Sequence, residues 1–123
     1  MNIYAEHVLD HYKRPRNAGA LKRPTHSFTD TNPLCGDRIT IELDVKDGLI
    51  VAARQATGGC AVSQAAASML FEHLEGMTVA QVLAIPKEEL LSEFGTELSV
   101  SRVKCALLSL QALKKALLEV RHA

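Results

Sequence analysis

Three cysteines and one aspartate are the residues of this chain whose types could do chemistry together. They lie in three contexts: Cys35-Gly36-Asp37, Gly58-Gly59-Cys60 and Lys104-Cys105. Three thiols and one carboxylate provide four donors, the number that a tetrahedral zinc ion or one edge of an iron-sulfur cluster requires, and thiolate selects such metals. The cysteines are too far apart for a zinc finger, whose paired ligands are separated by roughly two to four residues. The fold must therefore assemble the site, and we expect soft-metal or persulfide chemistry.

Each of these residues also has a plainer alternative. In an extended segment, residues two apart share a face, so we expect Cys35 and Asp37 to project together, with Cα atoms roughly 6.5 to 7 Å apart. The alternative for this pair is a turn cysteine beside a solvated or capping carboxylate. We expect Cys60 to open a helix, and Cys105 to lie in or near the first turn of the last helix beside Lys104, where helix N-termini and cations favour thiolates. The alternative for both is packing as small buried hydrophobes.

The histidines are weaker candidates for ligands. His7 and His11 could supply a further donor, but we expect them at surface or helix-capping positions. His73 has an alternative use near the C-terminal end of a predicted helix, where the helix dipole favours a positive charge. No histidine is included in the predicted ligand set.

Composition limits the classes of protein to consider. The chain has 123 residues, 47% of them hydrophobic, which is enough for one domain over residues 1–123 with a core that needs no disulfides. Acidic and basic side chains balance at 14 each, so no net charge favours nucleic acid or an acidic membrane. No secretory leader precedes the first amphipathic segment, and no apolar run approaches the ~20 residues that span a bilayer. We expect a cytoplasmic protein without nucleic-acid or membrane partners.

The elements that must position the cysteines follow from periodicity. Alternation of apolar and polar residues predicts strands at 38–46 and, joined by the tight turn Asp47-Gly48, at 49–56, with a weaker strand at 27–31. Helical spacing predicts the remaining elements: a helix from Ile3 to the Lys13–Asn17 cluster, a helix from Cys60 to Leu74 stopped by Gly76, short helices at 78–84 and 86–94, and a last helix capped by Ser99 or Ser101 with a stripe that reaches Val120.

Ordered motifs along nearly the whole chain resemble one known family. They are Tyr4, His11-Tyr12-Lys13-Arg14-Pro15-Arg16-Asn17-Ala18-Gly19, Asn32-Pro33-Leu34-Cys35-Gly36-Asp37, Gly58-Gly59-Cys60-Ala61-Val62-Ser63, Ala67-Ser68-Met69 and Lys104-Cys105-Ala106-Leu107. On these residues the sequence resembles the IscU, SufU and NifU N-terminal-domain family of iron-sulfur cluster assembly scaffolds.

The resemblance implies an α+β fold in which a three-stranded antiparallel sheet packs against about five helices. It also implies a site at one end of the molecule formed by Cys35, Asp37, Cys60 and Cys105. In this family a cysteine desulfurase delivers persulfide sulfur, a transient [2Fe-2S] cluster is built, and acceptor or carrier proteins receive it, while zinc is an alternative occupant. Such a protein is a scaffold or sulfur acceptor rather than a conventional enzyme, and it is a monomer or a homo-oligomer.

Two branches of the family remain open for this chain. Lys104 stands where IscU-type members have histidine, and Leu98-Ser99-Val100-Ser101-Arg102 replaces their leucine-proline-proline-valine-lysine chaperone-binding motif. Lys104 and the Asn-Pro context of Cys35 resemble the SufU type, a zinc-dependent sulfurtransferase that relays persulfide. The short interval between Cys60 and Cys105 lacks the SufU insertion and favours the scaffold. A third possibility is an interaction module in which zinc is purely structural.

Roles for individual ligands follow as hypotheses from this resemblance. Asp37, the harder ligand, would be labile and permit release of the cluster. Cys105 would receive the sulfane sulfur if the chain works like IscU, and Cys35 if it works like SufU.

Overall fold

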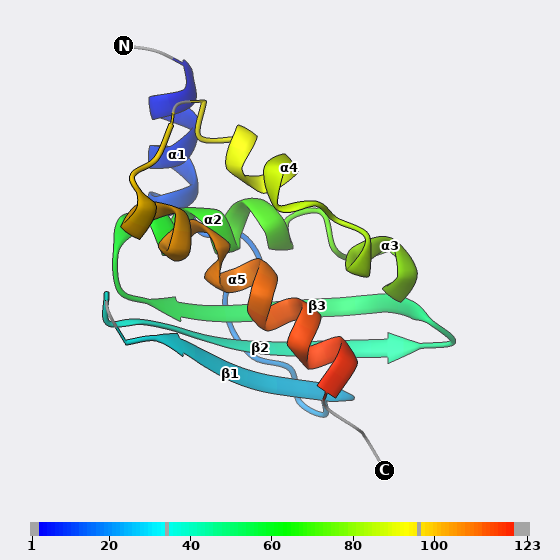
Figure 1. Ribbon diagram of the computed structural model, residues 1–123. Coiled ribbons are helices and arrows are strands. Elements are labelled where there is room, and N and C mark those ends of the chain that lie inside the picture. The colour runs from blue at the N-terminus through cyan, green and yellow to red at the C-terminus, as the bar shows by residue number, and fades with distance from the viewer. Residues whose placement is uncertain (1–2, 34, 96, 120–123) are drawn as a thin grey trace.

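One antiparallel sheet and five helices make up the part of the chain that the computed structural model describes, residues 3–33, 35–95 and 97–119. The elements in chain order are α1 (Ile3–Lys13), β1 (His26–Asn32), β2 (Asp37–Lys46), β3 (Leu49–Gly58), α2 (Ala61–Phe71), α3 (Val79–Leu83), α4 (Lys87–Ser92) and α5 (Val100–Glu119). The sheet order is β1-β2-β3, and α2 and α5 lie over one face of the sheet (Figure 1). The predicted α+β fold is confirmed.

The central strand shows why the alternation in the sequence produces this sheet. Ile39, Ile41 and Leu43 of β2 are completely buried beneath the helices, while the residues between them face the opposite side. Asp47 and Gly48 both have positive φ, 53° and 75°, as a two-residue turn of the mirror-image type requires between twisted strands. The predicted hairpin is therefore present, with β3 two residues longer than predicted.

Small side chains let the helical layer approach the sheet closely. Ala65, Ala66 and Ala67 of α2 are fully buried, and α5 adds the buried side chains of Leu110 and Leu113. Together with the apolar face of β2 they form one continuous core. Burial of this apolar surface is the main term that stabilises the fold.

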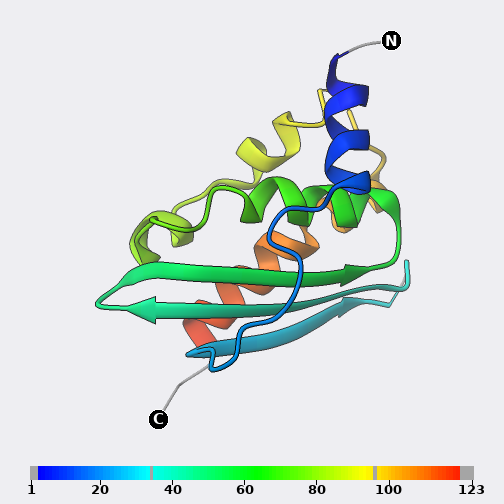
Figure 2. The same ribbon diagram turned by 180° about the vertical axis from the view of Figure 1, so that it is seen from behind.

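The outer face and the free edge of β3 are protected by connecting segments. The segment after α1 crosses the face of the sheet opposite the helices (Figure 2). On its way it pairs with the edge of β3, where the Gln55 N–H donates to Asn17 O at 2.8 Å. Farther along the same edge, the Ile50 N–H donates to Met77 O at 2.9 Å. Covered edges of this kind prevent uncontrolled strand pairing.

Helix α2 ends earlier than predicted, whereas the Ser99 cap predicted for α5 is confirmed. Helix α2 ends at Phe71 rather than Leu74, because the chain turns away to pair with β3 and Gly76 donates its N–H to Ile50 O at 2.8 Å. Gly76 is therefore not the residue that stops the helix. Helix α5 begins at Val100, with Ser99 Oγ accepting the Arg102 N–H at 3.4 Å. Val120, the last residue of the predicted stripe, lies outside the described residues. Within the described ranges, no helix is long and apolar enough to cross a membrane.

A cysteine and aspartate site at one end of the sheet

Three chain segments that are distant in sequence meet at one end of the sheet. They are the β1–β2 turn, the junction between β3 and α2, and the N-terminal half of α5, all at the left of Figure 1. Each segment carries one of the three cysteines. The fold thus brings together the residues that the sequence could only suggest as a set.

Cys35 lies in the turn between β1 and β2. Its N–H donates to Asn32 O at 3.1 Å, and Gly36 has a positive φ of 70°. The expected extended conformation is wrong, because Gly36 has a positive φ, but the expectation that Cys35 and Asp37 project together is confirmed, since their ligand atoms lie within 4.8 Å of each other. The Cys35 side chain is exposed to solvent.

Asp37 is a buried carboxylate held by the backbone of Cys60. Only 1% of its surface is exposed, and its Oδ1 accepts the Cys60 N–H at 2.8 Å. Its other oxygen, Oδ2, lies 3.8 Å from Cys60 Sγ, within the reach of a weak S–H donor. One oxygen is thereby fixed by the backbone, and the other faces the thiols.

Gly59 leaves the space that Asp37 occupies. A Cβ at this position would overlap the Asp37 carboxylate and lie 2.7 Å from its Cα. Gly59 also has φ of +116°, a conformation that L side chains rarely adopt. The glycine is therefore required both by the backbone conformation and by the close approach of the carboxylate.

Cys60 is the N-cap of α2, so the prediction that it opens a helix is confirmed. Its backbone is extended, and its Sγ accepts the Ser63 N–H at 3.5 Å. The side chain is half-buried. Its sulfur therefore lies at the positive end of the helix dipole.

Cys105 lies near the predicted place but differs from the prediction in its acidity. Helix α5 begins at Val100, so Cys105 lies in its second turn, and it is 1% exposed. Burial raises the pKa of the Cys105 thiol far above its usual range. Hydrogen bonds with three neighbours act in the same direction: Cys35, Asp37 and Cys60. Lys104 is exposed, and the expectation of a thiolate favoured by a helix start and Lys104 is wrong for the protein without metal.

The donor set has the dimensions of a metal site. One potential ligand atom from each of Cys35, Asp37 and Cys105 lies within 4.8 Å of the others, and Cys60 Sγ adjoins the same carboxylate. Three soft sulfur donors and one oxygen fit zinc or an iron-sulfur cluster better than a hard cation. A bound metal would stabilise the Cys105 thiolate and so offset the cost of ionising a buried thiol. The residues present therefore fit such a group.

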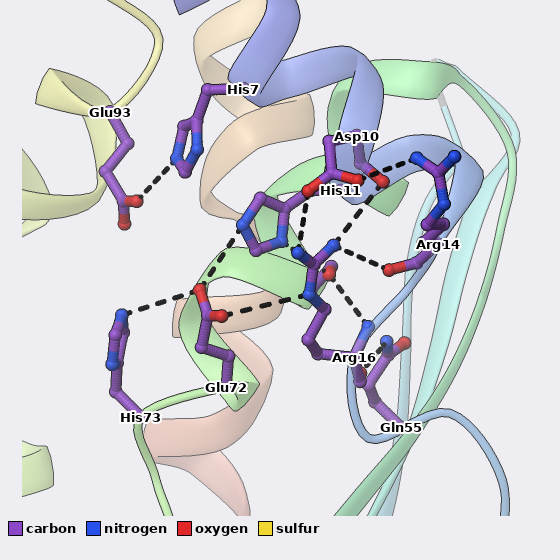
Figure 3. Close-up of polar contacts among 10 residues, drawn as sticks. His7, Asp10, His11, Arg14, Arg16, Gln55, Glu72, His73 and Glu93 are labelled. Carbon is purple, nitrogen blue, oxygen red and sulfur yellow. Dashed lines mark hydrogen bonds and ion pairs between the residues drawn. The ribbon is translucent and has the colours of Figure 1, made fainter.

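His7, His11 and His73 belong to a different cluster, formed by α1, α2 and the residues that follow α2 and α4 (Figure 3). His11 is 2% exposed; its Nδ1 lies 2.7 Å from Ser68 Oγ and its Nε2 lies 3.3 Å from Glu72 Oε2. His7 Nε2 contacts Glu93 at 2.9 Å. The expectation of a surface or capping position is wrong for His11, which joins α1 to α2.

Two residues of the site were not singled out by the sequence analysis. Gly59 was noted only as part of a glycine pair, and Asn32 only as part of a motif. Asn32 is the last residue of β1 and pairs directly with Asp37 across the strands. Their proximity in sequence to Cys60 and Cys35 was the one signal that could have identified them.

The fold and the site together define a class of protein: a small α+β domain with a centre of cysteines and one aspartate at the end of an antiparallel sheet. Residues 3–122 match the model of the family described as NifU-like N terminal domain. The chain belongs to this family.

Individual relatives represent both branches. The chain is 33% identical over 117 residues to the iron-sulfur cluster assembly scaffold protein IscU 1 of Archaeoglobus fulgidus, which covers 95% of this chain and 76% of the relative. It is 29% identical over 130 residues to the zinc-dependent sulfurtransferase SufU of Bacillus subtilis, covering 92% of this chain and 88% of the relative. The crystal structure of a NifU-like N-terminal protein from Brucella abortus shares the fold, with a TM-score of 0.73, 20% identity and coverage of 93% and 91% of the two chains.

Proposed function

We propose that this chain is a scaffold for iron-sulfur cluster assembly. It accepts sulfur from a cysteine desulfurase, binds iron and a transient [2Fe-2S] cluster, and transfers the cluster to acceptor proteins. The observation that carries the proposal is the convergence of three cysteines with a buried, oriented carboxylate from three separate segments. The ligands in this proposal are Cys35, Asp37, Cys60 and Cys105.

Sulfur enters at Cys35, because this is the exposed thiol of the three. The Cys35 thiolate attacks the terminal sulfur of the desulfurase persulfide, and a new S–S bond forms on Cys35. The S–S bond to the desulfurase breaks, and the desulfurase cysteine leaves as a thiolate. Cys105 is too buried to meet a second protein directly, so the exposure of the thiols supports Cys35 over Cys105 as the first acceptor.

The cluster is cargo, and the site is suited to release it. Asp37 is the one oxygen ligand in the proposed set, and carboxylate binds soft iron-sulfur centres less strongly than thiolate does. Its hydrogen bond from the Cys60 N–H orients the carboxylate within the site. Asp37 is therefore the ligand at which we expect exchange with an acceptor to begin.

A second function is a zinc-dependent sulfurtransferase that relays persulfide and carries no iron. The exposure of Cys35 favours it, since a relay needs one accessible thiol while the remaining donors hold zinc. The identity to a SufU protein supports the same alternative. A purely structural zinc site is disfavoured, because closed structural sites do not leave a ligand thiol exposed.

Anaerobic reconstitution distinguishes these functions. The wild type is mixed with ferrous iron, cysteine and a cysteine desulfurase, and absorbance spectra and metal content are measured alongside those of Cys35→Ser, Cys60→Ser and Cys105→Ser. The scaffold predicts a visible cluster spectrum that each substitution abolishes. Ser27→Ala, at an exposed position on β1, is the control and should assemble a normal cluster.

The alternative gives a different result in the same experiment. Retention of zinc without a cluster, combined with faster turnover of the desulfurase, would indicate the sulfur relay. Mass spectrometry of the product then locates the persulfide. A persulfide confined to Cys60 would contradict entry at Cys35.

A further inference from the structure

Asn32 carries a buried amide nitrogen that has no hydrogen-bond partner among the described residues. Its Nδ2 is inaccessible to solvent and makes no hydrogen bond to the part of the chain that the structure describes. A buried donor without an acceptor is destabilising, and native proteins rarely retain one without a reason. This amide lies beside the proposed site, so its missing partner is informative.

The register of the sheet fixes where this amide lies. Asn32 pairs with Asp37 in the β1–β2 ladder, so the two side chains share the face of the sheet that α5 covers. Directly paired residues have Cβ atoms about 4.5 to 5.5 Å apart. The Asn32 carbonyl also accepts the Cys35 N–H, so the same residue holds the turn that presents Cys35.

The thiols of the proposed site become good acceptors only once a metal is bound, because a metal displaces the thiol protons and is held by thiolates. A protonated thiol is a weak acceptor, whereas a metal-bound thiolate carries negative charge and accepts strong hydrogen bonds. The Asn32 amide N–H, which has no partner among the described residues, therefore gains an acceptor when the cysteines bind metal.

We infer that Asn32 is a positioning residue whose Nδ2–H donates a hydrogen bond to a thiolate sulfur of the loaded site. This inference rests on the proposed function only in that the cysteines bind a thiophilic metal. Donors of this kind orient ligands and withdraw negative charge from sulfur, and their loss typically lowers metal affinity about 10- to 100-fold. Without metal, the Asn32 N–H has no acceptor among the described residues, which destabilises the metal-free site. This difference in stability favours metal binding.

Two nearly isosteric substitutions test the inference with zinc alone as the probe. Asn32→Leu removes the donor, and Asn32→Asp replaces it with a carboxylate oxygen. In competition with a chromophoric chelator, the zinc dissociation constant should rise about 10- to 100-fold in Asn32→Leu. It should rise further in Asn32→Asp, because the new charge repels the thiolates. Zinc affinity equal to that of the wild type in both variants would overturn the inference.

Two further measurements separate hydrogen bonding from a change in packing. The metal-free Asn32→Leu protein should melt at a higher temperature than the wild type, because an unpaired buried donor has been removed. In the cobalt(II) form, the sulfur-to-cobalt charge-transfer band should move to lower energy, since a thiolate without its hydrogen bond gives up electrons more readily. A lower melting temperature together with weaker zinc binding would indicate damaged packing, and an unchanged cobalt band would exclude sulfur as the acceptor. Asn32→Ala, which also lacks a donor, replaces Asn32→Leu if the latter does not fold.

Ser109→Ala provides the matched control. Ser109 is on α5, one turn beyond Cys105, and its Oγ is also buried without a hydrogen-bond partner among the described residues. Its removal should raise the melting temperature without changing zinc affinity or the cobalt band. An equal loss of zinc affinity in Ser109→Ala would contradict a specific role for Asn32. If the wild type binds zinc through its cysteines but assembles no cluster, the scaffold function fails and the role of Asn32 is still decided by these variants.

Discussion

The carboxylate of Asp37 and the backbone N–H of Cys60 are joined by a 2.8 Å hydrogen bond. This bond connects the first residue of β2 to the N-cap of α2, so two ligands of the proposed site are positioned by each other. Hydrogen bonds to a carboxylate are stronger than those between neutral groups. A change at either residue should therefore affect both the local structure and the site.

Asp37→Ala and Asp37→Asn should both slow transfer of the cluster to an acceptor protein. Each removes the proposed labile oxygen ligand, and we expect a rate about tenfold lower, which corresponds to roughly 1.4 kcal/mol in the barrier. Asp37→Asn keeps an oxygen for the Cys60 N–H and so separates the loss of the ligand from the loss of the hydrogen bond. The loss of cluster absorbance on mixing with an apo acceptor gives the rate. Release at the wild-type rate in Asp37→Asn would show that the charged ligand has no part in transfer.

The sheet could be predicted from the sequence, which also named the four residues that we propose as the site. Alternation from Arg38 to Lys46 and the Asp47-Gly48 turn are local signals, and they determine the β2–β3 hairpin directly. The site itself was predicted by resemblance, because its ligands come from segments that only the tertiary fold brings together. What local patterns could not predict is the environment of each thiol.

Cys105 shows why the environments were not predictable. Its helix begins at Val100, as a Ser99 cap predicts, but the packing of that helix against α2 and β1 buries the thiol. The raised pKa follows from that burial, a property of packing rather than of sequence. His11 is a similar case, since its acceptor Ser68 lies on another helix.

Gly59→Ala should lower both stability and metal affinity, whereas Gly58→Ala should do neither. At Gly59 a new Cβ would displace Asp37, and the positive φ alone adds about 1–3 kcal/mol of strain. At Gly58 nothing lies within 4 Å of the added Cβ, so the free energy of unfolding should stay within about 0.5 kcal/mol of the wild type. Chemical denaturation and zinc titration of the two neighbouring variants give the comparison. Equal behaviour of the pair would show that Asp37 does not depend on the space beside Gly59.

Cys60→Ser and Cys60→Ala should differ in stability while both lose the cluster. The Cys60 sulfur caps α2 through the Ser63 N–H, and a serine hydroxyl can take over this role whereas alanine cannot. We expect Cys60→Ala to be less stable than Cys60→Ser by about 1 kcal/mol, the usual value of an N-cap. Thermal unfolding of the metal-free proteins measures the difference. If alanine is as stable as serine, the sulfur contributes nothing as a cap, and if either variant assembles a normal cluster, Cys60 is not a ligand.

His11 should make the protein less stable at mildly acidic pH. Burial, followed by the charge of Arg16, lowers the pKa of His11, while Glu72 and Glu93 oppose this shift and His7 adds to it. The unfolded chain therefore binds a proton more readily than the folded protein does. The contribution of His11 to stability is fully present above the ordinary histidine pKa of 6.5 and is lost as the pH falls from there toward the lower pKa of the folded state.

Substitution of His11 by glutamine tests this pH dependence. The free energy of unfolding of the wild type, measured by urea denaturation from pH 8 to 5, should fall below about pH 6.5, the ordinary histidine pKa. His11→Gln should be less stable than the wild type at pH 8, because it loses the ring contacts with Ser68 and Glu72, but its stability should change less with pH. His73→Gln, at a position that is 68% exposed, controls for the loss of a histidine and should keep the slope of the wild type. Parallel curves for the wild type and His11→Gln would mean that another group is responsible for the acid sensitivity.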